Sequence, residues 1–130
     1  MKEGKNMKYV VMVLVVIGLA MSFMSRGDSK NLVSYEELQQ KLNDKAPIVL
    51  LDVRTQEEFA NGHIPGALLL PYDEIDQNAS QLLPEKEKEI IIYCRSGRRS
   101  AIAKDSLEAL GYTNVKDFGG MNRWQGKVEK

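Results

Sequence analysis

Two nearly uninterrupted apolar runs, residues 48–53 (IVLLDV) and residues 89–93 (EIIIY), constrain the fold of this chain more than any other feature. Each has the length of one β-strand, and neither shows the alternation of apolar and polar residues that a strand with one solvent-facing side would have. Strands of this kind are covered on both faces, usually by the helices that connect parallel neighbours. The sequence therefore predicts an α/β domain with a mainly parallel sheet.

Local patterns place the other elements around these two strands. Ser34 and Thr55 each have the side chain that caps a short helix. Gly119 and Gly120 are expected to break the last strand before a final helical turn. The further expected elements are helices over residues 35–42, 56–60, 100–110 and parts of 73–83, and strands over residues 32–33, 67–70 and 114–118.

Composition excludes several classes of function. The 130 residues carry 18 Lys and Arg against 18 Asp and Glu, so the chain lacks the strongly basic character of a nucleic-acid-binding protein. A single Cys forms no intramolecular disulfide, and one Cys with one His cannot supply the usual ligands of zinc. We expect one globular domain without a metal site and without a nucleic-acid partner.

The N-terminal region has the layout of an export signal. Three lysines precede an uncharged and mostly apolar run over residues 9–25, and Arg26 follows it. A basic stretch before an apolar one directs a chain to the membrane, with the lysines kept in the cytoplasm. The expected division of the chain is a signal peptide or membrane anchor (residues 1–26), a linker (27–31) and an exported domain (32–130).

The sequence leaves open whether the N-terminal segment is cleaved. Ala20 and Ser22 are small residues at the spacing that a signal peptidase reads. The full run over residues 9–25 would span roughly 25 Å as a helix, short of the ~30 Å hydrocarbon core unless flanking residues help. The domain is then either anchored on the extracytoplasmic face of the cell membrane or, after cleavage, secreted or periplasmic.

The strongest indication of chemistry is the segment that follows the second apolar run, residues 94–100 (CRSGRRS). A buried strand delivers the only cysteine to its carboxyl end, where ligands bind in open α/β sheets. A loop there that faces a helix N-terminus directs several backbone N–H groups to one point. Arg95, Arg98 and Arg99 add positive charge, which favours a thiolate and attracts an anion. The alternative is an inert buried cysteine, but the polar neighbours favour a reactive one.

This segment is one of three that together resemble the single-domain rhodaneses, a family of sulfurtransferases. Residues 51–67 contain the short sequences LDVR, EEF and GHIPGA, which in this order and spacing resemble the family's first motif. Residues 94–100 resemble its catalytic loop, and residues 119–124 (GGMNRW) are similar to its closing motif. The resemblance implies a rhodanese-like fold, with a central, mostly parallel five-stranded sheet and helices on both faces.

The resemblance also implies roles for individual positions. Cys94 would be the nucleophile that accepts the sulfur, the rest of the loop would bind the sulfur donor, and polar residues of the first motif would support the loops around the pocket. The implied donor-binding residues are Arg95, Ser96, Gly97, Arg98, Arg99 and Ser100, and the implied supporting residues are Asp52, Arg54, Glu58 and His63.

Simple physical considerations give some of these positions plainer roles. Arg54 and Glu58 lie four residues apart, and we expect them to form an ion pair. His63 is expected to be a hydrogen-bonded residue rather than a base or a ligand. Met121 and Asn122 are candidates for lining the pocket.

The length of the loop distinguishes two reactions. The loop from Cys94 to Arg99 has six residues, whereas the Cys-x5-Arg loop of phosphatases of the related cell-cycle type has seven. The shorter loop suits a persulfide better than a phosphate. We predict a thiosulfate sulfurtransferase that takes a sulfane sulfur from thiosulfate or a similar small anionic donor as a Cys94 persulfide. The acceptor would be cyanide, a thiol or a protein, and no metal or organic cofactor is required. The alternative is a sulfur-carrier or redox-sensing module that uses the same cysteine without turning over small donors.

Overall fold

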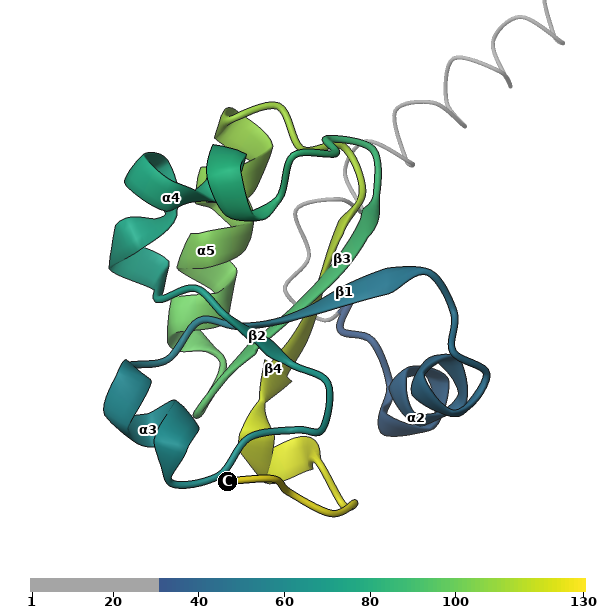
Figure 1. The fold of residues 1–130 in the computed structure, drawn as a ribbon. Helices are drawn as coiled ribbons and strands as arrows, with labels where there is room; N and C mark the ends of the chain where they lie inside the picture. The colour runs from purple at the N-terminus through teal and green to yellow at the C-terminus, as the bar shows by residue number, and fades with distance from the viewer. Residues whose placement is uncertain (1–30) are drawn as a thin grey trace, which may run out of the picture. The chain divides into compact units, whose positions relative to one another are not determined.

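A four-stranded sheet organises the part of the chain that this computed structural model describes, residues 31–130 (Figure 1). The strands are β1 (Ile48–Asp52), β2 (Leu68–Leu69), β3 (Glu89–Cys94) and β4 (Val115–Gly120), in the order β2-β1-β3-β4. All three pairings between neighbours are parallel. The predicted parallel sheet is confirmed, and the two apolar runs are its central strands.

Helices cover both faces of this sheet, as predicted (Figure 1). The helix α2 (Tyr35–Asn43) lies on one face, and α4 (Ile75–Leu82) and α5 (Arg98–Ala109) lie on the other (Figure 1). Ser34 and Thr55 cap α2 and α3, because each side chain accepts a hydrogen bond from the backbone N–H three residues later. The helical elements are α2 (Tyr35–Asn43), α3 (Gln56–Ala60), η1 (Tyr72–Glu74), α4 (Ile75–Leu82), α5 (Arg98–Ala109) and η2 (Met121–Arg123).

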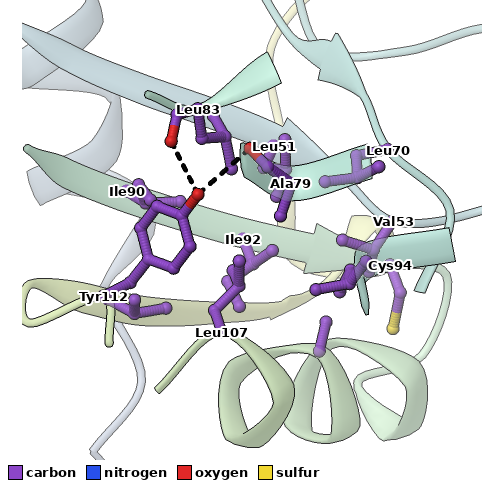
Figure 2. Packing of buried hydrophobic residues seen from close by; sticks show 13 residues of the cluster. Leu51, Val53, Leu70, Ala79, Leu83, Ile90, Ile92, Cys94, Leu107 and Tyr112 are labelled. Atoms are coloured by element: carbon purple, nitrogen blue, oxygen red, sulfur yellow. Dashed lines mark hydrogen bonds between the residues drawn. The ribbon is translucent and has the colours of Figure 1, made fainter. Parts of the chain in front are cut away.

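Alternate side chains of β3 supply the two halves of the core. Ile92 and Cys94 belong to the cluster under α4 and α5, whereas Ile91 and Tyr93 belong to the cluster that α2 covers. The two-residue period of a strand produces this division. It places the cysteine on the same face as α5, whose first turn it adjoins (Figure 2).

The sheet has four strands rather than the expected five. The segment around Leu32 and Val33 does reach the edge of the sheet, because the Val33 N–H donates to the Asp117 carbonyl at 2.8 Å. It is not a strand, since Ser34 already caps α2 and the chain turns away before a ladder can form.

The strand β4 continues through Gly119–Gly120, which were wrongly expected to end it. Asp117 pairs with Ile92 and Gly119 pairs with Tyr93, so Phe118 is the extra residue of a β-bulge. The first glycine of the pair has a φ of 92°, a conformation that glycine adopts without a steric penalty. The bulge lets the strand continue to the position opposite Cys94.

The helix α5 begins at Arg98, two residues earlier than expected. Gly97 precedes it with a φ of 106°, in the left-handed region, so the chain turns from strand to helix within a few residues. The loop between Cys94 and α5 is therefore very short.

No helix within residues 31–130 has the length and apolar character needed to cross a bilayer. The expected signal or anchor segment, residues 1–26, lies outside the described residues, as does most of the linker, residues 27–31.

Candidate functional site

Cys94 lies at the point where β3 ends and the loop to α5 begins. Its side chain is fully buried, and its sulfur accepts a hydrogen bond from the Gly97 N–H, with 2.9 Å between nitrogen and sulfur. The left-handed conformation of Gly97 turns this amide back toward the strand end. The loop therefore directs a backbone donor at the only cysteine of the chain.

The loop rests directly on the second glycine of β4. Cys94 is the register partner of Gly120, and a methyl group on Gly120 would lie 2.7 Å from the Arg95 carbonyl oxygen and 2.9 Å from the Ser96 Cα. Both distances are shorter than van der Waals contact, so the two backbones approach this closely only because residue 120 has no side chain. The absence of a side chain at Gly120 thus determines how closely the loop packs against β4.

A cavity of about 660 Å³ opens beside the loop. Arg95 and Ser96 form its wall on the loop side, and both are exposed, whereas Cys94 is fully buried and is not one of the lining residues. Met121 and Asn122 line it from η2, as expected. The complete lining is Arg54, Glu58, Asn61, Gly62, Arg95, Ser96, Met121, Asn122 and Val128. The sequence points to neither Asn61 nor Val128, because no local pattern distinguishes them.

The three arginines of the loop have different surroundings. Arg99 makes a bidentate pair with Glu58, with 2.7 Å from Nη1 to Oε1 and 2.9 Å from Nη2 to Oε2. Arg95 and Arg98 are exposed and take part in none of the ion pairs found in residues 31–130. Only Arg95 of these two lines the cavity. Ser100, by contrast, is fully buried beneath the loop.

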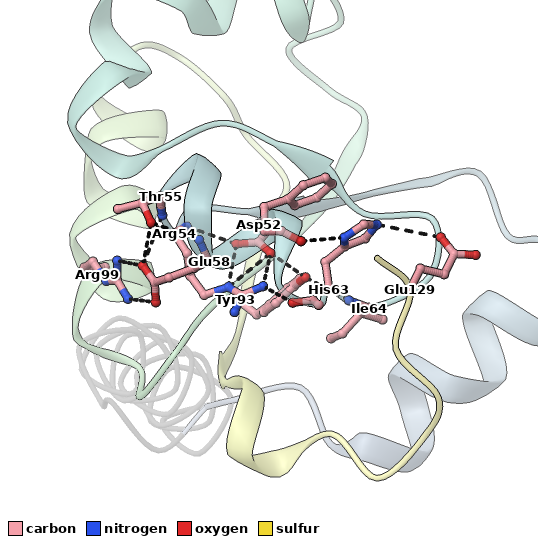
Figure 3. A network of polar contacts seen from close by, with 11 residues as sticks. Asp52, Arg54, Thr55, Glu58, His63, Ile64, Tyr93, Arg99 and Glu129 are labelled. Carbon is pink, nitrogen blue, oxygen red and sulfur yellow. Dashed lines mark hydrogen bonds and ion pairs between the residues drawn. The ribbon is translucent and has the colours of Figure 1, made fainter.

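Glu58 does not pair with Arg54, contrary to expectation (Figure 3). Arg54 precedes α3, so helical spacing does not bring the two side chains together. The Glu58 carboxylate instead accepts from Arg99 and, at 3.2 Å, from the Thr55 N–H, which completes a capping box. The hydrogen bond from Arg99 lowers the pKa of Glu58 from 4.5 to about 2.

Arg54 pairs with Asp52 in a buried network beside the cavity (Figure 3). The Arg54 Nη2 lies 2.7 Å from Asp52 Oδ2 and also donates to the Gly62 carbonyl at 2.7 Å. The Tyr93 hydroxyl donates to Asp52 at 2.7 Å and accepts from the Ile64 N–H at 3.0 Å. Burial and the hydrogen bond to Asp52 raise the pKa of Tyr93. This network ties the segment after α3 to the ends of β1 and β3.

His63 joins the segment after α3 to the C-terminal segment around Glu129. Its Nδ1 lies 2.9 Å from the Phe59 carbonyl oxygen, and its ring stacks on the Phe59 ring with 3.7 Å between centroids. Its backbone pairs with Glu129 through hydrogen bonds of 2.9 and 2.8 Å. This pairing places Val128 at the cavity. His63 is therefore a hydrogen-bonded residue next to the lining residue Gly62, and its Nδ1 interacts with a backbone carbonyl group.

Comparisons with known proteins agree on one family. The sequence profile of the family described as rhodanese-like domain matches residues 34–127. A putative sulfur carrier protein of Bacillus subtilis, YrkF, is 37% identical over 98 residues, which cover 75% of this chain and 52% of that protein. Thiosulfate sulfurtransferase PspE of Escherichia coli is 35% identical over 71 residues, or 55% of this chain and 68% of the relative. The chain thus spans about half the length of the first of these relatives.

A solved structure gives the same result. The human single-domain sulfurtransferase TSTD1 superposes with a TM-score of 0.65 at 32% sequence identity, covering 74% of this chain and 96% of that one. The likeness therefore extends over nearly the whole of a protein that consists of one such domain.

The Glu58–Arg99 pair predicts a pH-dependent contribution to stability. Because folding lowers the pKa of Glu58 from 4.5 to about 2, its contribution is fully present above pH 4.5 and is lost as pH falls toward 2. We expect Glu58→Gln to lower the free energy of unfolding by about 1 kcal/mol at pH 7, allowing for solvent screening of the partly exposed pair. The deficit relative to the wild type should shrink steadily in urea titrations between pH 5 and pH 2. The matched control is Glu57→Gln, an exposed neighbour on α3, which should change stability little. A constant deficit across this pH range would show that the ion pair contributes nothing.

Proposed function

The chain belongs to the rhodanese-like family, and on that basis we propose that it is a thiosulfate-type sulfurtransferase that carries sulfur as a persulfide on Cys94. Two of its relatives, the E. coli protein PspE and human TSTD1, are named as sulfurtransferases. The observation that carries the finer proposal is the hydrogen bond from the Gly97 N–H to the Cys94 sulfur, at a strand end that adjoins a helix N-terminus. A sulfur placed in this way can hold negative charge before and after it accepts a second sulfur atom.

The proposed reaction is a double displacement. The Cys94 thiolate attacks the outer sulfur of thiosulfate, a new sulfur–sulfur bond forms, and the original sulfur–sulfur bond breaks with its electron pair going to sulfite. An acceptor nucleophile, cyanide or a thiolate, then attacks the outer sulfur of the persulfide. The Cys94 thiolate leaves with the electron pair of the bond that breaks, and the protein returns to its starting state.

Backbone groups stabilise the charged sulfur in this scheme. The Gly97 N–H already points at Cys94, and the N-terminus of the 12-residue helix α5 lies next to it. Donors that are fixed in place before the reaction need no reorganisation when charge develops, which is why such groups lower reaction barriers. The burial of Cys94 strengthens these interactions because little water competes for the sulfur.

Donor binding is assigned chiefly to Arg95. It is the loop arginine that both lines the cavity and lacks an ion-pair partner in residues 31–130. Arg99 is neutralised by Glu58, so its part is to hold the first turn of α5 against α3. Arg98 is exposed and does not line the cavity. The three arginines that look equivalent in sequence therefore have separate roles in this proposal.

Loss of the cysteine sulfur tests the proposed nucleophile. Cys94→Ser differs by one atom, so we expect it to fold while forming no persulfide and transferring no sulfur from thiosulfate to cyanide. Because the chain has only one cysteine, a gain in intact mass of one sulfur atom in the wild type can be assigned to Cys94. Sulfur transfer by the folded serine variant would refute the proposed mechanism.

Separate neutralisation of two arginines tests the assignment of donor binding. We expect Arg95→Gln to raise the thiosulfate KM about tenfold, the usual effect of losing one hydrogen bond to a charged group. The matched control, Arg98→Gln, removes the same charge three residues away and should change KM much less. Added salt should raise the KM of the wild type more than that of Arg95→Gln, because salt screens exposed charges. Equal effects of the two substitutions would mean that only the general charge of the loop matters.

A sulfur-carrier function is the second candidate, and the name of the B. subtilis relative favours it. A carrier would use the same persulfide but would accept sulfur from, or give it to, a protein partner. It is distinguished by persulfide formation on Cys94 without steady-state turnover of thiosulfate and cyanide.

We also propose that residues 1–26 place the domain outside the cytoplasm, either anchored or released. The support is the sequence itself, with lysines before an apolar run. A protease added to intact protoplasts should then digest the membrane-held domain while a cytoplasmic marker survives. The medium or periplasmic fraction should be probed in parallel for released domain. Retention of all the protein in a protease-protected form would contradict this placement.

A further inference from the structure

Asp117 is a buried carboxyl group behind the loop that the scheme above does not use. It lies on β4 beside Ile92, on the face that α5 covers, with 9% of its surface exposed. Its Oδ1 accepts the Gly119 N–H at 2.8 Å, within the β-bulge. Burying a carboxyl group costs free energy because the group loses its contacts with water, and an apolar residue at this position would not have that cost. A polar group here therefore requires a specific reason.

A chain of hydrogen bonds connects this carboxyl group to the cysteine. The Ser100 hydroxyl interacts with Asp117 and also donates to the Gly97 carbonyl oxygen at 3.0 Å. The N–H of the same Gly97 residue donates to the Cys94 sulfur at 2.9 Å. Gly97 is therefore held through its carbonyl by Ser100 and through its amide by Cys94. Ser100 is fully buried, so water does not replace either of its contacts.

The surroundings of Asp117 suit a group that supports Ser100. Burial raises the pKa of Asp117, and the hydrogen bonds from Ser100 and Gly119 oppose that rise, as do the charges of Lys104 on α5 and Arg123 on η2. Ser100 has a single hydroxyl proton and lies between the Gly97 carbonyl oxygen and the Asp117 carboxyl group, so its contact with Asp117 limits the rotation of the hydroxyl that holds Gly97.

We propose that Asp117 is a positioning residue for sulfur transfer, which acts through the Ser100 hydroxyl to fix Gly97 and thereby the amide that donates to the Cys94 sulfur. The inference rests on the proposed function in taking Cys94 as the reacting residue. It assigns Asp117 and Ser100 to the reactivity of the sulfur, whereas Arg95 is assigned to binding of the donor.

Substitutions at the two positions test this chain of contacts in the full-length protein. We expect Asp117→Leu and Ser100→Ala each to lower kcat for thiosulfate about tenfold, the size of one lost hydrogen bond, with little change in the thiosulfate KM. Asp117→Asn should restore most of the rate, because its amide oxygen accepts from Gly119 and its amide nitrogen donates to Ser100. The matched control is Asp105→Leu on the exposed side of α5, which should leave kcat unchanged.

The double variant provides the sharpest result. If Asp117 acts through Ser100, the double variant Asp117→Leu with Ser100→Ala should be no slower than the slower single variant. The rate of Cys94 alkylation by iodoacetamide should follow the same pattern, and this readout does not require sulfurtransferase activity. It therefore separates a failure of this inference from a failure of the proposed function.

Two results would overturn the inference. One is a pair of single variants whose losses multiply in the double variant, since that would mean independent effects. The other is a set of variants with lowered melting temperatures but unchanged kcat and unchanged alkylation rate, which would make Asp117 a purely structural residue. If Asp117→Leu does not fold, Ser100→Ala alone must still lower kcat and alkylation, and adding Asp117→Asn to it must cause no further loss.

Discussion

The hydrogen bond from the Gly97 amide to the Cys94 sulfur depends on distant parts of the chain meeting at one point. The strand β3 brings the cysteine to the edge of the sheet, and α5 begins immediately after Gly97. The bulge in β4 extends that strand to Gly120, whose missing side chain admits the loop backbone. The bulge disrupts the regular ladder between β3 and β4, which is its structural cost. The common effect of these features is to place an amide donor and a helix N-terminus at one buried sulfur atom.

Paired charges hold the walls of the cavity beside the loop that follows Cys94. Asp52 and Arg54 neutralise each other under one wall, and Glu58 and Arg99 join α3 to the start of α5. The Asp52–Arg54 pair is buried, and buried charges are stable only when they are paired and hydrogen-bonded. Both pairs also fix the loops that carry them. Arg95 remains at the cavity without such a partner in residues 31–130, so the site has a positive charge to offer an anionic donor.

The sequence predicts the elements whose causes are local, and it fails where the cause is tertiary. The runs at residues 48–53 and 89–93 identify the central strands, and the cap at Thr55 identifies α3. The continuation of β4 through Gly119–Gly120 is not predictable in this way, because the reason for the glycines is the loop packed against them. The expected pair of Arg54 with Glu58 fails for a similar reason, since Asp52 and Arg99 reach these side chains from other elements.

The most direct test of the account is a single-turnover measurement with excess thiosulfate and no sulfur acceptor. If the buried Cys94 accepts one sulfur atom by displacement, sulfite should be released as a burst of one equivalent per folded chain, and release should then stop. Addition of cyanide should restart it, with thiocyanate and sulfite formed in equal amounts. A burst far below one equivalent with fully folded protein, or continued sulfite release without an acceptor, would contradict the claim that the sulfur is held on Cys94.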